Sequence, residues 1–394
     1  MSEGPGCPAA ATMTASLEQL LAAKEIAICC GAGGVGKTTT AAAAAAMAAV
    51  SLGGKVLVLT VDPARRLADA LGMEELGNTE VRVPDSVMKA AGVEPRGELW
   101  AAMLDAKQSW DELVRRHAPN PGTVKRILEN PLYENISGRF AAGNEYIAME
   151  RLYEIHRAGA YDLIVVDTPP TRHALDFLEA PDRMADFFSS RLLRWLTARS
   201  RMVNLASRPF YQVADRVLGS QFLQDIAEFF LLFQTMYEGF VERSHAVKRL
   251  VHGRRTTFIV VTALEATPLR EAEFFMDALG RMGLHAGALV LNKVLPGYLL
   301  DAGATRVAGR LRADGAALAA ALGPDAGDPA VVARVLREVG ESFLNFGVVA
   351  KREAEQRAEL ATRPDIVVAV PFFDTDIYDL GGLLRLGRVL WAAP

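Results

Sequence analysis

The sequence predicts an α/β fold, a doubly wound and mostly parallel sheet that carries a helical insertion subdomain. Short runs rich in Ile and Val alternate with longer helical segments along the 394 residues. A glycine-rich loop joins the first of these runs to an alanine-rich helix, and two later runs end in aspartate. Buried parallel strands read as continuous apolar runs, and the right-handed crossovers between them are usually helices. These observations favour a parallel sheet covered by helices on both faces.

Six runs have the length and composition of buried strands, and a seventh is weaker. They are Ile26–Cys30, Val56–Val61, Leu163–Val166, Thr257–Val261, Ala288–Leu291 and Ile366–Val370, with Leu99–Leu104 as the weaker candidate. A helical segment follows most of them, so we expect β-α-β units whose ligand-binding edge is formed by the carboxyl ends of the strands.

Two intervals between the strands, residues 63–162 and 181–255, are too long for a simple crossover, and a third helical stretch, residues 302–363, precedes the last strand. Residues 63–162 hold the weaker strand candidate and amphipathic helices, and residues 302–363 are helical in pattern. Residues 181–255 show no strand pattern and many long apolar side chains, so we expect a helical insertion there. The domain prediction is therefore a mobile tail of small residues at 1–18 and one domain at 19–394 that contains the insertion 181–255.

Composition and charge exclude several classes of protein. The apolar fraction of 51% supplies a large core, and the formal net charge of -4 gives no reason to expect a nucleic-acid partner. The cysteines are Cys7, Cys29 and Cys30, and the last two point to opposite faces of one strand, so we expect neither a zinc site nor disulfides. The N-terminus lacks the pattern of a signal peptide, and the apolar runs are too short to span a bilayer. We expect a cytoplasmic location.

The glycine-rich loop fits the Walker A pattern in full. Its sequence is Gly31-Ala32-Gly33-Gly34-Val35-Gly36-Lys37-Thr38, followed by Thr39. Glycines let backbone N–H groups surround a phosphate, the lysine contacts the β- and γ-phosphates, and the threonine hydroxyl is a magnesium ligand. The alternative is a glycine-rich turn with a surface lysine, but the strand before the loop and the helix after it favour a P-loop. We expect ATP and Mg²⁺ to bind here, with Gly33 to Thr39 around the phosphates.

The two aspartates end strands of the same predicted sheet. Asp167 follows Leu163–Val166 and is the natural Walker B carboxylate on the magnesium side. Asp62 follows Val56–Val61 and is a candidate to polarise the attacking water. A helix N-cap before Pro63 is the alternative for Asp62, and the two roles are compatible. For Asp167 the alternative is a residue that simply ends its strand.

These motifs together resemble the ArsA-type ATPases, a family that includes the arsenite-pump ATPase and the eukaryotic targeting factor for tail-anchored proteins. The resemblance rests on the glycine-rich loop, on Asp62-Pro63-Ala64 and on Asp167-Thr168-Pro169-Pro170-Thr171-Arg172-His173. The resemblance extends from about residue 26 to the last strand, and the chain looks like a bacterial member of the family. The resemblance implies a deviant Walker A fold, a dimer with nucleotides near the interface, and magnesium-dependent ATP hydrolysis.

The resemblance also implies roles for individual residues. Asp62 corresponds to the water-activating residue and Asp167 to the metal-side residue, while Lys37 serves catalysis as well as binding. Asn292 corresponds to the family's base-reading asparagine, although asparagine also favours turns regardless of any ligand. Pro371 and Phe372, just after the last strand, correspond to the loop beside the adenine.

The chain departs from the family pattern at three points. Ala32 stands where the family has the signature lysine that reaches the partner subunit's phosphates. Either hydrolysis is slow, or a related subunit supplies the lysine, so both a homodimer and a mixed dimer remain open. The cysteines also suit neither a zinc clamp nor arsenite, which needs soft thiolate ligands.

Aromatic residues recur at helical spacing in the predicted insertion. One apolar set comprises Met184, Phe187, Phe188, Leu192 and Trp195, and another comprises Phe222, Ile226, Phe230, Phe233, Tyr237 and Phe240. The second helix carries a further stripe of Phe229, Leu232 and Met236. Such stripes usually form core, and in the resembling targeting factor this region binds a client's transmembrane helix. A hydrophobic or membrane-protein client is therefore one expectation and ordinary core the other. The alternative to an energy-coupling ATPase is a poorly hydrolysing ATP-dependent switch or a regulatory subunit of a mixed dimer. The long insertion argues against a positioning ATPase of the MinD or ParA type.

Overall fold

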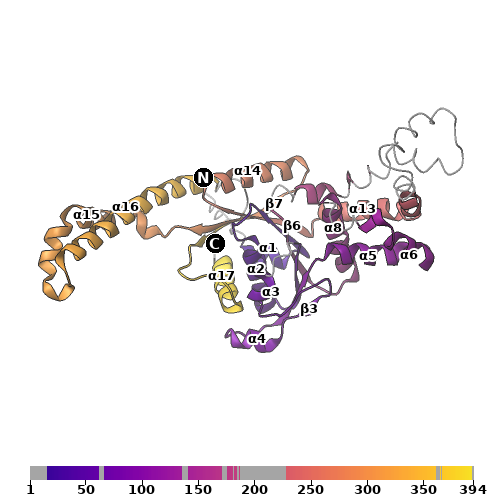
Figure 1. Cartoon of the computed structure of the whole chain (residues 1–394), viewed down its shortest axis with the longest axis horizontal. Coiled ribbons are helices and arrows are strands. Elements are labelled where there is room, and N and C mark those ends of the chain that lie inside the picture. The colour runs from indigo at the N-terminus through magenta and orange to yellow at the C-terminus, as the bar shows by residue number, and fades with distance from the viewer. Residues whose placement is uncertain are drawn as a thin grey trace, which may run out of the picture.

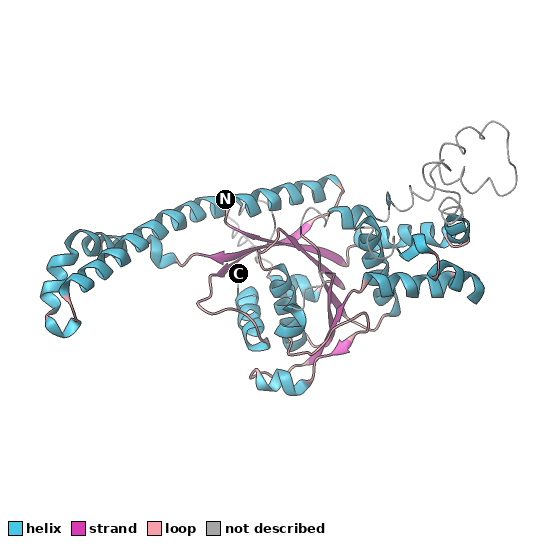
Figure 2. Ribbon diagram, in the orientation of Figure 1, coloured by secondary structure: helices cyan, strands magenta, loops and turns pink. Residues whose placement is uncertain are grey.

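The computed structural model describes residues 16–61, 66–134, 141–170, 175–180, 182–183, 186, 228–360, 364 and 366–392. Its centre is an eight-stranded sheet with the order β3-β4-β2-β5-β1-β6-β7-β8 (Figures 1 and 2). The strands are β1 Ile26–Gly31, β2 Gly54–Thr60, β3 Val81–Arg82, β4 Gly97–Met103, β5 Leu163–Asp167, β6 Thr256–Ala263, β7 Ala286–Val294 and β8 Ile366–Pro371. All neighbours pair in parallel except β3, which is antiparallel to β4.

The seven predicted strands are confirmed, and the doubly wound, mostly parallel fold with them. The sequence missed β3, because its two residues are both exposed and carry no apolar pattern. β7 extends three residues beyond the predicted Leu291, through Asn292 and Lys293, which are too polar to read as strand. The strand ends matter for function, since ligands bind at the carboxyl edge of such a sheet.

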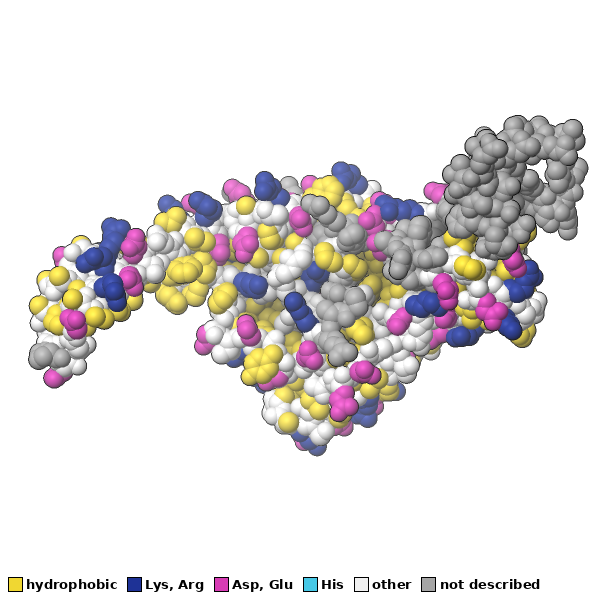
Figure 3. All heavy atoms as spheres, viewed as in Figure 1, with side chains coloured by type: hydrophobic (Ala, Val, Ile, Leu, Met, Phe, Trp, Pro, Cys, Tyr) yellow, Lys and Arg dark blue, Asp and Glu magenta, His cyan; other side chains and the backbone are white. Residues whose placement is uncertain are grey.

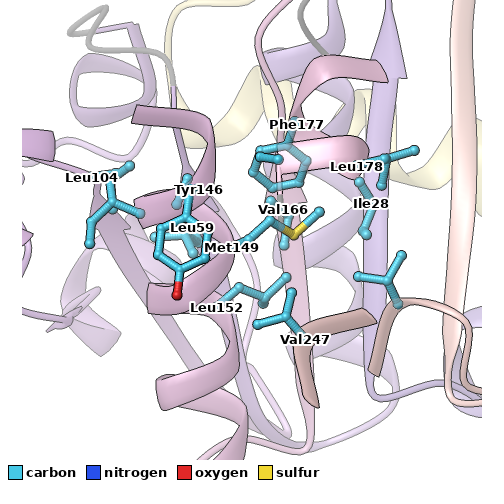
Figure 4. Close-up of a cluster of buried hydrophobic side chains, with 14 of the residues drawn as sticks. Ile28, Leu59, Leu104, Tyr146, Met149, Leu152, Val166, Phe177, Leu178 and Val247 are labelled. Atoms are coloured by element: carbon cyan, nitrogen blue, oxygen red, sulfur yellow. The ribbon is translucent and has the colours of Figure 1, made fainter. Parts of the chain in front are cut away.

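Helices cover both faces of the sheet and enclose two separate cores. One face packs against α1 Leu17–Ala22, α2 Lys37–Ser51, α3 Arg66–Ala70, α4 Asp85–Ala90 and α17 Leu380–Ala392. The other packs against α5 Ala106–His117, α6 Pro121–Leu128, α8 Ala141–Ala158, α13 Tyr237–Val251 and α14 Ala266–Arg281. Alternate residues of β1 point into the two cores, as the period of a strand requires. Figure 4 shows part of the second core, where Ile28 and Val166 meet Met149 and Phe177.

Small residues let α2 lie close to the sheet and to α17. Ala41 to Ala46 are at most 1% exposed, so the helix beyond the phosphate loop is embedded rather than amphipathic. A Cβ added to Gly387 of α17 would lie 3.1 Å from the Ala43 carbonyl oxygen. This packing fixes the start of α2, and with it the loop that precedes the helix.

The described part of the predicted insertion is helical, at residues 228–234 and in α13. Three of its aromatic residues belong to the core: Phe229, Phe233 and Phe240 are at most 3% exposed and cluster with Trp110 and Tyr146. For these residues the core interpretation holds. The first apolar set and Phe222 and Ile226 lie outside the described residues.

Two long helices form an arm that leaves the body of the molecule beside β7 and β8 (Figure 1). They are α15 Ala302–Leu322 and α16 Pro329–Leu360, joined through the short helix η3 Pro324–Ala326. The helices approach closely at Gly340, where a Cβ would lie 2.5 Å from the Ala308 carbonyl oxygen. On the face seen in Figure 3, acidic and basic side chains are interspersed along this arm, and apolar ones show between them. No helix of the described residues is both long enough and apolar enough to cross a membrane.

Candidate functional site

Two glycines shape the phosphate loop between β1 and α2. A Cβ on Gly31 would lie 2.0 Å from the Val261 carbonyl oxygen of β6, so only glycine fits where the loop leaves the sheet. Gly36 caps the N-terminus of α2 with a left-handed backbone (φ 92°), and a Cβ there would lie 2.4 Å from the Asn292 amide nitrogen. Between them, the loop leads into the N-terminus of α2, where backbone N–H groups and the helix dipole favour an anion.

Lys37 is the first residue of α2 and is buried, with 8% of its surface exposed. Its ammonium group donates a hydrogen bond of 3.0 Å to the carbonyl oxygen of Ala32, across the loop. A lysine that folds back over its own loop in this way already points into the space that the loop surrounds. It is therefore positioned to contact phosphate oxygens.

The Asp167 carboxylate lies beside the loop and joins β2, β5 and α2. Its Oδ2 atom accepts hydrogen bonds from the Thr38 hydroxyl at 2.6 Å and from the Thr60 hydroxyl at 2.9 Å. Asp167 is only 1% exposed. Hydroxyl and carboxylate oxygens are the hard ligands that Mg²⁺ prefers, so the donors present at Thr38 and Asp167 fit magnesium.

Cys29 and Cys30 are buried in β1 just before the loop, and they are poor candidates for metal ligands. Burial raises the pKa of Cys29, and the nearby Asp167 carboxylate raises it further. Burial also raises the pKa of Cys30 to about 12. Both thiols are therefore protonated at neutral pH, whereas soft metals bind the thiolate.

The other end of the site is built by β7 and β8. Asn292 donates from its amide nitrogen to the Val35 carbonyl oxygen at 2.7 Å, and the Lys293 ammonium donates to the Gly34 carbonyl oxygen at 3.3 Å. Pro371 ends β8, and Phe372, whose side chain is largely exposed, follows it. A cleft of about 620 Å³ runs from the phosphate loop to these residues. Its size is in the range of small-ligand sites.

Most of the predicted site residues meet in this one cleft. Those lining it are Gly33, Gly34, Gly36, Lys37, Thr38, Thr39, Asn292, Pro371 and Phe372. Val35 is buried, and its carbonyl oxygen accepts a hydrogen bond from Asn292. Asp167 accepts a hydrogen bond from the Thr38 hydroxyl. Asp62 and His173 lie outside the described residues, so the role of Asp62 stays a prediction.

The structure adds cleft residues that the sequence interpretation missed. Arg66 and Asp69 come from α3, Lys293 follows Asn292, and Tyr378 comes from the segment between β8 and α17. Lys293 could have been found from its place directly after Asn292. The others carry no motif, and only the fold brings them to the cleft.

Comparison with known proteins identifies a family for this chain. The sequence profile of a family described as "Anion-transporting ATPase" matches residues 24–310. The chain is 26% identical over 267 residues to an ATPase GET3 from Malassezia globosa, covering 68% of this chain and 72% of that one. It is 26% identical over 268 residues to a putative arsenical pump-driving ATPase 2 from Aquifex aeolicus, covering 68% of this chain and 79% of that one.

Proposed function

This chain belongs to the anion-transporting ATPase family, and from that premise we propose that it is a dimeric, magnesium-dependent ATPase that couples its nucleotide state to its helical region. ATPase activity itself follows from the family. The observation that supports binding of a whole nucleotide is the cleft that joins the phosphate loop to the ends of β7 and β8. The curated relatives are named as ATPases of two kinds, GET3 and arsenical pump-driving ATPases.

The phosphates bind in the loop between β1 and α2. Backbone N–H groups of Gly33 to Thr39 hold the β-phosphate, and Lys37 leaves the Ala32 carbonyl to contact the β- and γ-phosphates. Thr38 and Asp167 would hold Mg²⁺, which would supply positive charge to the phosphate oxygens. Thr60 keeps the Asp167 carboxylate oriented by its 2.9 Å hydrogen bond.

We assign the activation of water to Asp62. In the sequence it follows Val61, whose backbone N–H donates to the Asp167 carbonyl oxygen at 3.0 Å. This contact supports the proposal that Asp62 acts beside Asp167. A carboxylate there orients a water molecule and accepts its proton as the water attacks phosphorus. The ammonium of Lys37 then stabilises the charge on the departing β-phosphate oxygens.

Ala32 is the reason to propose a mixed dimer rather than a homodimer. This residue is 6% exposed and has no cation to offer to a second site, so a homodimer would have two sites without that charge. A cation supplied in trans can be worth 10³ or more in rate, as an arginine finger shows. We therefore propose that the most active form pairs this chain with a related subunit that carries the missing lysine.

The helical residues after β5 are the proposed output of the nucleotide cycle. Residues 175–180 follow the segment after Asp167 and pack into the core with Phe229 and α13. Movement at the end of β5 would thus be transmitted to these helices. A hydrophobic or membrane-protein client is the proposed partner. The insertion 181–255 is the proposed subdomain that receives it, through residues other than Phe229, Phe233 and Phe240, which belong to the core.

The experiment is a comparison of ATP binding and steady-state phosphate release in Mg²⁺ and in EDTA. We expect the wild-type protein to bind and hydrolyse ATP with magnesium, Lys37→Ala to lose binding, and Asp62→Asn to bind ATP without turnover. Sedimentation of Asp62→Asn with ATP then measures the dimer. If the wild type binds ATP tightly but releases no phosphate even with a lysine-bearing homologous subunit, the protein is a nucleotide-dependent switch, and the coupling mechanism above is wrong.

A further inference from the structure

The junction of β7 and the cleft contains a backbone irregularity at Asn292 and Lys293. The pairing of β7 with β8 shifts register between Leu291, opposite Ala369, and Val294, opposite Pro371. Three steps on β7 thus match two on β8, which is a β-bulge. Bulges re-aim side chains and are frequent beside active sites.

The bulge also places Lys293 in a conformation that its residue type disfavours. Its φ is 60°, and among the described residues it is the one non-glycine residue with a positive φ. A non-glycine residue keeps a left-handed backbone only when its surroundings stabilise that conformation, and such residues cluster at functional sites. Here the surroundings are specific: the Lys293 N–H donates to the Asn292 Oδ1 atom at 3.0 Å.

The result is a two-residue clamp on the phosphate loop. Asn292 binds the carbonyl oxygen of Val35, and Lys293 binds that of Gly34, at 2.7 and 3.3 Å. Two consecutive residues of β7 thus bind two consecutive carbonyl groups of the loop. The clamp connects the loop to β7, which lies two positions away from β1 in the sheet.

The order of the strands decides which part of a nucleotide Lys293 faces. Asp167 ends β5, on one side of β1, whereas Lys293 is at the end of β7, on the other side. Three strand spacings separate β5 from β7, or about 14 Å at about 4.8 Å each. If Thr38 and Asp167 hold the metal at the terminal phosphate, the end of the cleft that Lys293 and Phe372 line is left for the nucleoside.

We propose that Lys293 is a nucleoside-positioning residue: its ammonium group stays on the Gly34 carbonyl and donates to the ribose, while its carbon stem packs against the base. An ammonium group has three donors, and the Gly34 oxygen uses one of them. Lysine stems pack on apolar surfaces while their charged ends remain hydrated. This inference rests on the proposed ATP site and adds to it a residue outside the predicted set.

The proposal differs from the obvious role of a cleft lysine, which is to bind phosphate. Inorganic tripolyphosphate separates the two, because it has the phosphates of ATP and no nucleoside. For Lys293→Ala we expect a tenfold or larger loss of affinity for both ATP and ADP, with tripolyphosphate affinity unchanged within twofold. Lys293→Met, which keeps the stem, should lose less than Lys293→Ala. Titration calorimetry with magnesium measures all of these.

Two controls make the test decisive. Lys37→Ala should lose affinity for ATP and for tripolyphosphate alike. A wild-type protein that binds neither ligand would refute the proposed ATP site itself, not only the role of Lys293. Lys293→Asn suits the left-handed backbone, so it should keep the melting temperature of the wild type while losing ATP affinity. An equal loss of tripolyphosphate and ATP in Lys293→Ala, or no loss of ATP, overturns the assignment.

Discussion

Replacing Gly36 by alanine tests the geometry of the phosphate loop most directly. The residue has φ 92° and ψ 27°, a region that an alanine reaches at a cost of about 1–2 kcal/mol. The new Cβ would also lie 2.4 Å from the Asn292 amide nitrogen, so Asn292 would have to release the Val35 carbonyl. A hydrogen bond of this kind contributes a net of about 1 kcal/mol. The total is about 2–3 kcal/mol.

This cost appears either in folding or in binding. If the loop keeps its shape, Gly36→Ala lowers the free energy of unfolding. If the loop relaxes, ATP affinity falls by as much as about 30- to 150-fold, since 1.4 kcal/mol is a factor of ten. The sum of the two losses is therefore the quantity to compare with the estimate. Denaturant unfolding of the free protein and titration with ATP measure the two parts.

Two further variants identify the source of the loss. Gly33→Ala adds a Cβ with no atom within 4 Å, so the free protein should keep its stability. Combining Gly36→Ala with Asn292→Ala removes the clash, so the double variant should lose about 1 kcal/mol less than the sum of the single ones. If Gly36→Ala changes neither stability nor affinity by more than about 0.5 kcal/mol, the loop geometry described above is wrong.

Three other expectations concern the metal side, the missing cation and pH. Asp167→Asn should bind ATP in EDTA as the wild type does but lose the gain from Mg²⁺, which paired titrations check. Ala32→Lys should raise ATP turnover of the isolated chain tenfold or more; unchanged turnover removes the case for a mixed dimer. Burial and the Arg243 charge lower the pKa of His117 from 6.5 to about 4. The unfolded chain therefore takes up the proton first, so this contribution to stability is complete above about pH 6.5 and is lost toward pH 4. Burial raises the pKa of Glu150, and this shift changes stability with pH in the opposite direction. It is present in the wild type and in a His117→Gln variant alike, so it cancels when the two are compared. His117→Gln should therefore lose less stability than the wild type between pH 6.5 and 4 in denaturant titrations.

The parts of the fold that the sequence predicted depend on local patterns or on one general rule. Continuous apolar runs predicted the buried strands, and the rule that strand ends share an edge predicted that Thr38 and Asp167 would meet across 129 residues. The aromatic residues of the insertion could not be assigned by spacing alone, because a buried stripe and a client groove have the same pattern. Their burial around Phe233 decides the question for the described part.

What the sequence could not predict depends on register between strands. The bulge at Asn292 and Lys293 exists because β7 and β8 pair out of step, and no local pattern records that mismatch. The ion pair between Glu150 and Arg243 was missed for another reason: it joins helix α8 to helix α13 at 2.5 Å, and only the packing of the two helices brings the residues together. Asn292 was predicted for a role at the base, and its contact with Val35 emerged only from the folded chain.

The arm has a mechanical consequence. Helix α16 is one element of 32 residues, and at 1.5 Å per residue it is about 48 Å long. Its inner end comes within a few residues of β8, the strand that ends at Pro371 beside the cleft. A lever of that length magnifies rotation: a tilt of about 5° at the inner end displaces the outer end by about 4 Å. The tip is thus a sensitive place for a spectroscopic label, because a shift at the cleft too small to resolve directly becomes measurable there.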